Sequence, residues 1–160
     1  MNDLPTTGKT LVIRTDFGSD AGWAAVCRAM SLPAQELHFR DEILCLSDPD
    51  YDGLSAPELA EMASRAEHQG HAFLADAVTI AQQDHPVLVV DLADSPGRCF
   101  RVIASEMWSL HSNLEVINKS FGEYADRADP DGVYRGFGPR YAEAMQALID
   151  TLKSANRQGS

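Results

Sequence analysis

The chain has 160 residues, with 24 acidic and 13 basic side chains and a formal net charge of -11 at pH 7. Its hydrophobic fraction of 44% is ordinary for a globular protein, so disorder is expected only at the ends. A surface this acidic repels nucleic-acid phosphates and anionic membranes. The charge therefore excludes nucleic acid and membrane as predicted partners and leaves cations or a basic protein.

Cysteine usage and the lack of a targeting segment predict a cytoplasmic location. The three cysteines, Cys27, Cys45 and Cys99, are odd in number and lack metal-site spacing. Because they lie in apolar strand-like or helical stretches, they are expected to be small, reduced residues of the core. The N-terminus has no apolar signal region, and no stretch is long enough to span a bilayer.

The first half of the chain alternates between predicted strands and predicted helices. Short apolar runs predict strands over residues 10–15, 42–47 and 71–75. The spacing of apolar residues predicts helices over residues 21–30 and 56–68, and one or two helical turns over residues 77–83. Ser55 and Glu58 form a capping-box pattern at the start of the second helix. This order is typical of parallel strands joined by right-handed crossovers.

The second half opens with the longest apolar run, residues 87–92, which fits a strand buried on both faces. Residues 93–97 contain proline and glycine and predict a turn of hairpin length. Residues 98–103 are the expected partner strand, nearer the edge of the sheet. A second capping-box pattern predicts a helix from Ser120. An amphipathic helix is predicted over residues 139–156.

These elements predict one α/β domain over residues 9–156, with flexible ends at residues 1–8 and 157–160. The sheet is expected to be mixed, with a βαβαβ-like first half, a β-hairpin and C-terminal helices. An α+β arrangement is the alternative. No internal repeat, low-complexity tract or linker divides the chain.

Four of the predicted strands end in aspartate, at Asp16, Asp48, Asp76 and Asp91. The carboxyl ends of parallel strands share one edge of a sheet, where open α/β sheets bind ligands. Converging carboxylates could hold Mg²⁺ for phosphoryl transfer or hydrolysis. That hypothesis requires Asp16 and Asp91 to lie close together. The alternative, and the commoner role, is that each aspartate caps a helix or closes a turn.

No catalytic or phosphate-binding motif accompanies these aspartates. The sequence has no P-loop, no G-x-G-x-x-G and no G-x-S-x-G elbow. The five histidines are scattered without the spacing of a triad or a metal site: His38, His68, His71, His85 and His111. The sequence therefore predicts no catalytic residue, and no cofactor unless the aspartates bind Mg²⁺.

Several segments together resemble a family of small bacterial proteins whose domain has no known function. The segments are LVIRTDF, FLAD, HPVLVVDL, PGRCFRVIASEMW and the tract from NLEVINKSFGEYAD to DGVYRGF, which span roughly residues 10–137. This resemblance implies no established activity and carries no catalytic residues. The tract from the hairpin to SFGEYAD is also similar to the immunity domains of the SUKH superfamily, which pair a late hairpin with a helix opening on serine, phenylalanine and an acidic residue. The βαβ-like first half departs from that superfamily.

The charge and the absent catalytic signatures favour a non-enzymatic module that docks a basic protein partner, as an immunity protein docks a toxic nuclease. The predicted contact residues come from loops and from the stretch after the hairpin: Asp50, Tyr51, Asp52, Trp108, Tyr134 and Phe137. Tyr134 and Phe137 are expected to be exposed and, with Trp108, to act as apolar anchors.

Two other classes compete with this interpretation. One is a small Mg²⁺-dependent enzyme or metabolite-binding domain that uses the four strand-end aspartates. The other is an accessory subunit that docks through the apolar stripe between Tyr141 and Leu152 of the final helix.

Overall fold

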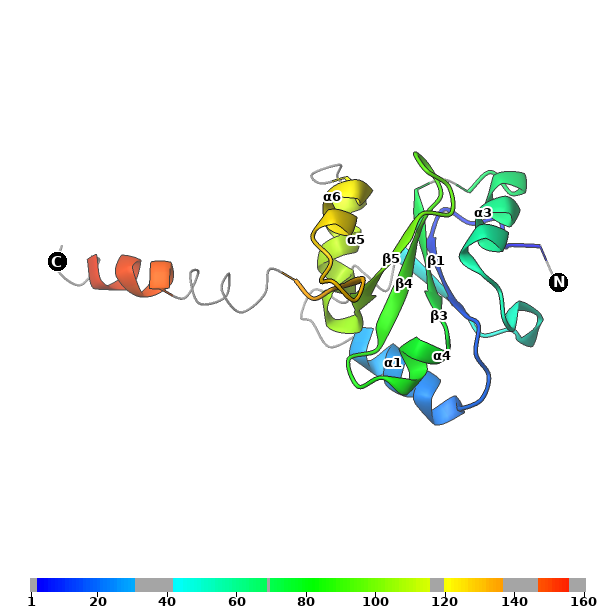
Figure 1. The fold of residues 1–160 in the computed structure, drawn as a ribbon, viewed down its shortest axis with the longest axis horizontal. Coiled ribbons are helices and arrows are strands. Elements are labelled where there is room, and N and C mark those ends of the chain that lie inside the picture. The colour runs from blue at the N-terminus through cyan, green and yellow to red at the C-terminus, as the bar shows by residue number, and fades with distance from the viewer. Residues whose placement is uncertain (1–2, 31–41, 69, 116–119, 137–146, 156–160) are drawn as a thin grey trace.

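The computed structural model describes residues 3–30, 42–68, 70–115, 120–136 and 147–155 (Figure 1). Within these residues, six strands form one mixed sheet in the order β2-β1-β3-β4-β5-β6. The strands are β1 (Thr10–Arg14), β2 (Ile43–Leu46), β3 (His71–Ala75), β4 (Pro86–Asp91), β5 (Cys99–Ile103) and β6 (Val133–Tyr134). The α/β class with a mixed sheet is confirmed.

The pairing directions decide at which end of the sheet, along the strand direction, the carboxyl end of each strand lies. β1 pairs in parallel with both β2 and β3, as the alternation of strands and helices predicted. β4 runs antiparallel to both β3 and β5, which confirms the hairpin, and β6 pairs in parallel with β5. The carboxyl ends of β1, β2 and β3 therefore lie at one end of the sheet, and the carboxyl end of β4 lies at the opposite end.

Helices cover both faces of the sheet, giving three layers (Figure 1). The described helices are α1 (Asp20–Met30), α3 (Ala56–Arg65), α4 (Ala77–Ala81), α5 (Met107–Glu115) and α6 (Phe121–Asp126), with 3-10 turns η1 (Pro49–Tyr51) and η2 (Ala104–Glu106). α3 packs on one face, and α1, α4, α5 and α6 pack on the other.

Alternation along the central strands divides the core between the two faces. Val12 and Phe73 face the layer that contains α1 and α5, whereas Leu11, Ile13 and Leu74 face α3. Every residue of β3 is buried. Because helices cover both faces, β3 and β4 read as nearly continuous apolar runs instead of alternating ones.

Two serines start helices where the capping-box pattern predicted. The side chain of Ser55 accepts a hydrogen bond from the backbone N–H of Glu58 at 3.3 Å, at the start of α3. Ser120 accepts one from the N–H of Glu123 at 3.2 Å, at the start of α6. Each side chain satisfies a backbone donor that the first helical turn leaves without an intrahelical partner.

The cysteines are less buried than the sequence predicted. Cys45 and Cys99 are exposed, and Cys27 is half-buried. Both exposed cysteines belong to strands of the outer part of the sheet, β2 and β5, and the side chain of a strand residue alternates between faces. The expectation of three core cysteines is therefore wrong for Cys45 and Cys99.

Residues 147–155 are helical, in agreement with the last part of the predicted final helix. Leu148 and Leu152 are 51% and 61% exposed there, and Tyr141 lies outside the described residues. The exposure of these leucines is what an accessory subunit would require, and that hypothesis stays a prediction. Among the helices that the structure describes, none is both long and apolar enough to cross a membrane.

Gly22 of α1 lies directly against Ile80 of α4. A Cβ atom at this position would overlap the Cγ2 atom of Ile80. Gly22→Ala is therefore expected to lower the free energy of unfolding by about 1 kcal/mol, even though alanine favours a helix by a similar amount, because overpacking costs about 1–3 kcal/mol. Urea denaturation measures the change. In an Ile80→Ala background the same substitution should become neutral or stabilising, and equal effects in both backgrounds would contradict the overlap.

Candidate functional site

Five aspartates gather where β1 and β2 end, and we call them the acidic edge: Asp16, Asp20, Asp48, Asp50 and Asp52. The backbone N–H of Gly53 donates to the carbonyl of Thr15 at 2.9 Å, so the loop after β2 lies against the end of β1. Asp20, Asp50 and Asp52 are exposed, and the Asp20 side chain is 94% accessible. The carboxyl ends of β1 and β3, which this group of aspartates adjoins, point toward the lower side of Figure 1, where α1 and α4 lie.

Arg14 is a buried cation behind the acidic edge. It is 3% exposed, and its guanidinium donates to the Asp20 carboxylate and to the Asp16 carbonyl, both at 2.9 Å. The guanidinium carbon also lies 4.4 Å from the centre of the Phe17 ring and 5.9 Å from that of Trp23. Arg14 therefore pairs with Asp20, while Asp50 and Asp52 lie exposed on the same edge.

The four strand-end aspartates do not converge on one point. In the register of β3 and β4, Asp91 pairs with His71, the first residue of β3, whereas Asp16 lies two residues beyond the end of the parallel strand β1. The Asp91 side chain accepts hydrogen bonds from the N–H groups of Ala93 and Ser95 at 2.9 and 3.0 Å, within the β4–β5 turn. The expected proximity of Asp16 and Asp91 is wrong, because β4 runs antiparallel.

Asp48 and Asp76 have the capping role that was the alternative to metal binding. Asp48 accepts a hydrogen bond from the N–H of Asp50 at 3.0 Å, at the start of η1. Asp76 accepts one from the N–H of Thr79 at 3.1 Å, at the start of α4. These two residues and Asp16 follow parallel strands, and a magnesium role for the three stays a prediction.

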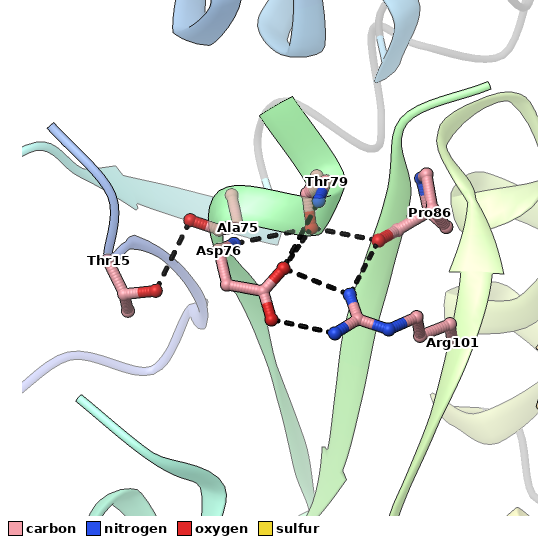
Figure 2. A network of polar contacts seen from close by, with 6 residues as sticks. All are labelled: Thr15, Ala75, Asp76, Thr79, Pro86 and Arg101. Carbon is pink, nitrogen blue, oxygen red and sulfur yellow. Dashed lines mark hydrogen bonds and ion pairs between the residues drawn. The ribbon is translucent and has the colours of Figure 1, made fainter. Parts of the chain in front are cut away.

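Asp76 is also the centre of a polar network that joins β3, β4 and β5 (Figure 2). Arg101 of β5 contacts both oxygens of its carboxylate, at 3.0 and 2.7 Å, and donates to the carbonyl of Pro86 at 3.1 Å. The Thr79 hydroxyl donates to the same carbonyl at 2.8 Å. Burial raises the pKa of Asp76, but hydrogen bonds from Arg101 and Thr79 outweigh it and hold that pKa below its ordinary value. This network ties three strands together.

The predicted partner-binding residues divide by exposure. Asp50 and Asp52 are exposed on the acidic edge. Tyr51 between them is 3% exposed, and its hydroxyl donates to the carbonyl of Asp3 at 3.0 Å. Tyr134 is 2% exposed because it belongs to β6 and packs edge-on against Tyr124, so the expectation of an exposed anchor is wrong there.

The two remaining predicted anchors differ in what the structure shows. Trp108 is half-buried and packs against the core on the α1–α5 side. Phe137 lies outside the described residues. The docking role of the exposed aspartates stays a prediction.

A second group of side chains lies at the other end of the sheet, and we call it the histidine cluster: His71, His111, Glu42 and Glu115. His71 begins β3 and His111 lies on α5, and they are 6% and 1% exposed. Nε2 of His71 and Nδ1 of His111 are 3.0 Å apart, and Nε2 of His111 is 2.9 Å from a carboxylate oxygen of Glu42. The two imidazoles thus form a hydrogen-bonded chain that leads to a half-exposed carboxylate.

When both rings are uncharged, the hydrogen bonds fix their tautomers. An ionised Glu42 carboxylate only accepts, so Nε2 of His111 is the donor and its Nδ1 carries a lone pair. Nε2–H of His71 then donates to that lone pair. Burial, with a smaller contribution from His111, lowers the pKa of His71 to about 3, while Asp91 acts in the opposite direction. His71 is therefore a neutral imidazole at physiological pH.

His71 also lies between two cavities. One of about 240 Å³ is lined by His71 and Glu115 together with Thr7, Lys9 and His68. The other, of about 380 Å³, is lined by His71 with residues of the β4–β5 turn and of α5 and α6. The cluster is therefore close to space that a ligand could enter.

The sequence did not predict the histidine cluster. His71 and His111 are far apart in the chain, and their contact depends on how α5 packs on the sheet. One signal was present, because His111 and Glu115 are four residues apart and share a face of α5. Spacing on one helix, combined with a histidine at the start of a buried strand, would have marked this group.

Comparison with known families gives one result. A family model described as "Domain of unknown function (DUF6924)" matches residues 9–137 of the chain. The match includes all six described strands, the acidic edge and the histidine cluster. Comparison with curated proteins finds no match. The similarity to SUKH immunity domains stays a prediction.

Proposed function

The chain belongs to the DUF6924 family of domains of unknown function, and we propose that its domain is a binding module whose acidic edge docks a basic protein partner. The observation that carries this proposal is the exposure of Asp20, Asp50 and Asp52 at one end of the sheet. Asp20 pairs with Arg14, and the exposed carboxylates of Asp50 and Asp52 beside it attract Lys- and Arg-rich surfaces over several ångströms and speed their encounter.

The surroundings of the acidic edge support this function. Two arginines near this end of the sheet each pair with an aspartate: Arg14 with Asp20, and Arg101 with Asp76. The net charge of -11 strengthens the negative potential around the edge. Rim charges of this kind act mainly on the association rate, and added salt screens them over about 8–10 Å.

The loop that carries Asp50 and Asp52 is built to hold its shape. η1 is capped by Asp48, and the buried Tyr51 anchors the loop between the two exposed aspartates. Gly53, at a positive φ of 73°, turns the chain back toward β1. A partner would therefore meet two carboxylates in a preformed arrangement, which lowers the entropic cost of docking.

The experiment couples the purified domain to a resin and passes lysate of the source cell over it at low and at moderate salt. A partner whose capture depends on salt is then purified, and its association rate constant is measured. Asp50→Asn/Asp52→Asn should lower that constant about ten-fold at low salt, with little change at high salt.

A matched control removes the same charge elsewhere. Asp94 in the β4–β5 turn and Glu123 on α6 are both exposed and lie away from the acidic edge. Asp94→Asn/Glu123→Gln should change the association rate much less. If no salt-sensitive partner is captured, or if both double variants slow association equally, the acidic edge is not the docking surface.

A further inference from the structure

We propose that His71, His111 and Glu115 form a binding site for a divalent transition-metal ion of the Zn²⁺ class. One ligand atom of each residue, two imidazole nitrogens and a carboxylate oxygen, lies within 4.8 Å of the other two. Among the residues that the structure describes, this is the one group of three or more histidine, cysteine or acidic side chains whose ligand atoms all lie that close to one another. The site is at the opposite end of the sheet from the acidic edge, so the inference stands apart from the docking proposal.

The distances are close to those that a metal ion requires. Zinc binds imidazole nitrogen and carboxylate oxygen at about 2.0–2.2 Å, which places neighbouring ligand atoms of a tetrahedral site roughly 3.3–3.5 Å apart. The nitrogens of His71 and His111 are 3.0 Å apart, so a small separation of the rings admits the ion. Glu115 is exposed at the end of α5, and rotation of its side chain can bring the carboxylate into range.

Glu42 completes the arrangement from outside the ligand set. Metal-binding histidines generally donate their second ring N–H to a carboxylate, which orients the ring and raises its basicity. Nε2 of His111 is 2.9 Å from Glu42 Oε2, and this bond leaves the Nδ1 lone pair directed at the site. Two histidines and one glutamate, with a carboxylate behind one histidine, is a ligand set found in zinc sites with an open position.

A change of tautomer at His71 allows both imidazoles to bind the ion as neutral ligands. Without metal, the proton on Nε2 of His71 lies between the two rings. When the ion enters, that proton transfers to Nδ1 of the same ring, and the freed Nε2 lone pair becomes the ligand. The ring stays neutral, so no net proton is gained or lost at His71.

The cavity of about 240 Å³ supplies access and a further coordination position. His71 and Glu115 both line it, and so does Lys9. Three protein ligands leave room for water or a small anion on the ion. The imidazole pair selects against Mg²⁺ and Ca²⁺, which prefer oxygen ligands.

The test is calorimetric titration of the full chain with Zn²⁺ after removal of metal with EDTA. One ion should bind per chain. Glu115→Gln, a change at an exposed position that leaves the core intact, should weaken binding at least ten-fold, and Glu42→Gln should weaken it about ten-fold. Glu123→Gln removes the same charge from exposed α6 and should leave the affinity unchanged.

A spectrum of the protein loaded with Co²⁺ separates this site from the cysteines. A tetrahedral-type visible band without a thiolate-to-cobalt charge-transfer band is expected, since the ligands are nitrogen and oxygen. Thiolate bands, absence of saturable Zn²⁺ binding to the wild type, or equal affinities of Glu115→Gln and Glu123→Gln would each overturn the proposal. The last result would exclude Glu115 from the ligand set and leave the three-residue site without its carboxylate.

Discussion

Arg101→Ala is expected to lower the free energy of unfolding by about 2–3 kcal/mol at pH 7. The guanidinium makes two short hydrogen bonds to Asp76 and one to the carbonyl of Pro86, and the two charged side chains are only 21% and 31% exposed. Removing it leaves a half-buried carboxylate without its cation. For a chain of this size the loss corresponds to a fall in melting temperature of roughly 5–10 °C, which calorimetry measures.

A second ion pair of the chain provides the control. Arg65 and Glu61 pair at 3.1 Å on the surface of α3, with side chains 61% and 74% exposed. Arg65→Ala should cost less than about 0.5 kcal/mol, because exposed pairs contribute little. Equal losses for Arg65→Ala and Arg101→Ala would show that the network in Figure 2 has no special stabilising role.

The sign of the pH dependence gives a further check on Arg101. The pKa of Asp76 is lowered in the folded protein, so its stabilising contribution is present above the unfolded pKa of about 3.9 and is lost as the pH falls through the folded value. The difference in stability between the wild type and Arg101→Ala should therefore shrink as the pH falls below about 4.

Local sequence patterns predicted the elements of this fold because each pattern depends on near neighbours. The apolar run of β4, the Pro-Gly turn and the partner strand β5 lie within residues 86–103, and the hairpin is confirmed. Ser55 and Ser120 start helices because a cap needs only three following residues. The two-residue strand β6 was missed, since it forms only by pairing with β5.

Contacts between distant parts of the chain could not be predicted in this way. A run ending in aspartate looks the same in a parallel and an antiparallel strand, so Asp91 was placed with Asp16 although it lies at the opposite edge. Tyr134 was expected in a loop, and pairing with β5 buries it. The histidine cluster joins β3 to α5, and no local pattern specifies that packing.

Acidification below pH 6.5 is expected to destabilise the metal-free protein through His71. The buried ring has its pKa lowered to about 3, chiefly by burial, whereas the unfolded chain takes up this proton near pH 6.5. Between these values the unfolded state binds more protons, so stability is full above pH 6.5 and falls as the pH falls. The loss should approach about 1.4 kcal/mol for each pH unit, or roughly 2–3 kcal/mol between pH 6.5 and 4.5.

Urea denaturation in EDTA at several pH values measures this loss, and His71→Gln isolates its source. A glutamine amide can donate to Nδ1 of His111 as the imidazole does, but it takes up no proton in this range. Every other titrating group is common to the two proteins, including His111 and Asp91, which lie beside the ring. The variant should therefore lose roughly 2–3 kcal/mol less than the wild type between pH 6.5 and 4.5. Parallel pH profiles of the wild type and His71→Gln would contradict this prediction. They would mean that His71 takes up its proton in the folded protein as readily as in the unfolded chain, so that the ring is not held buried against α5 at acidic pH.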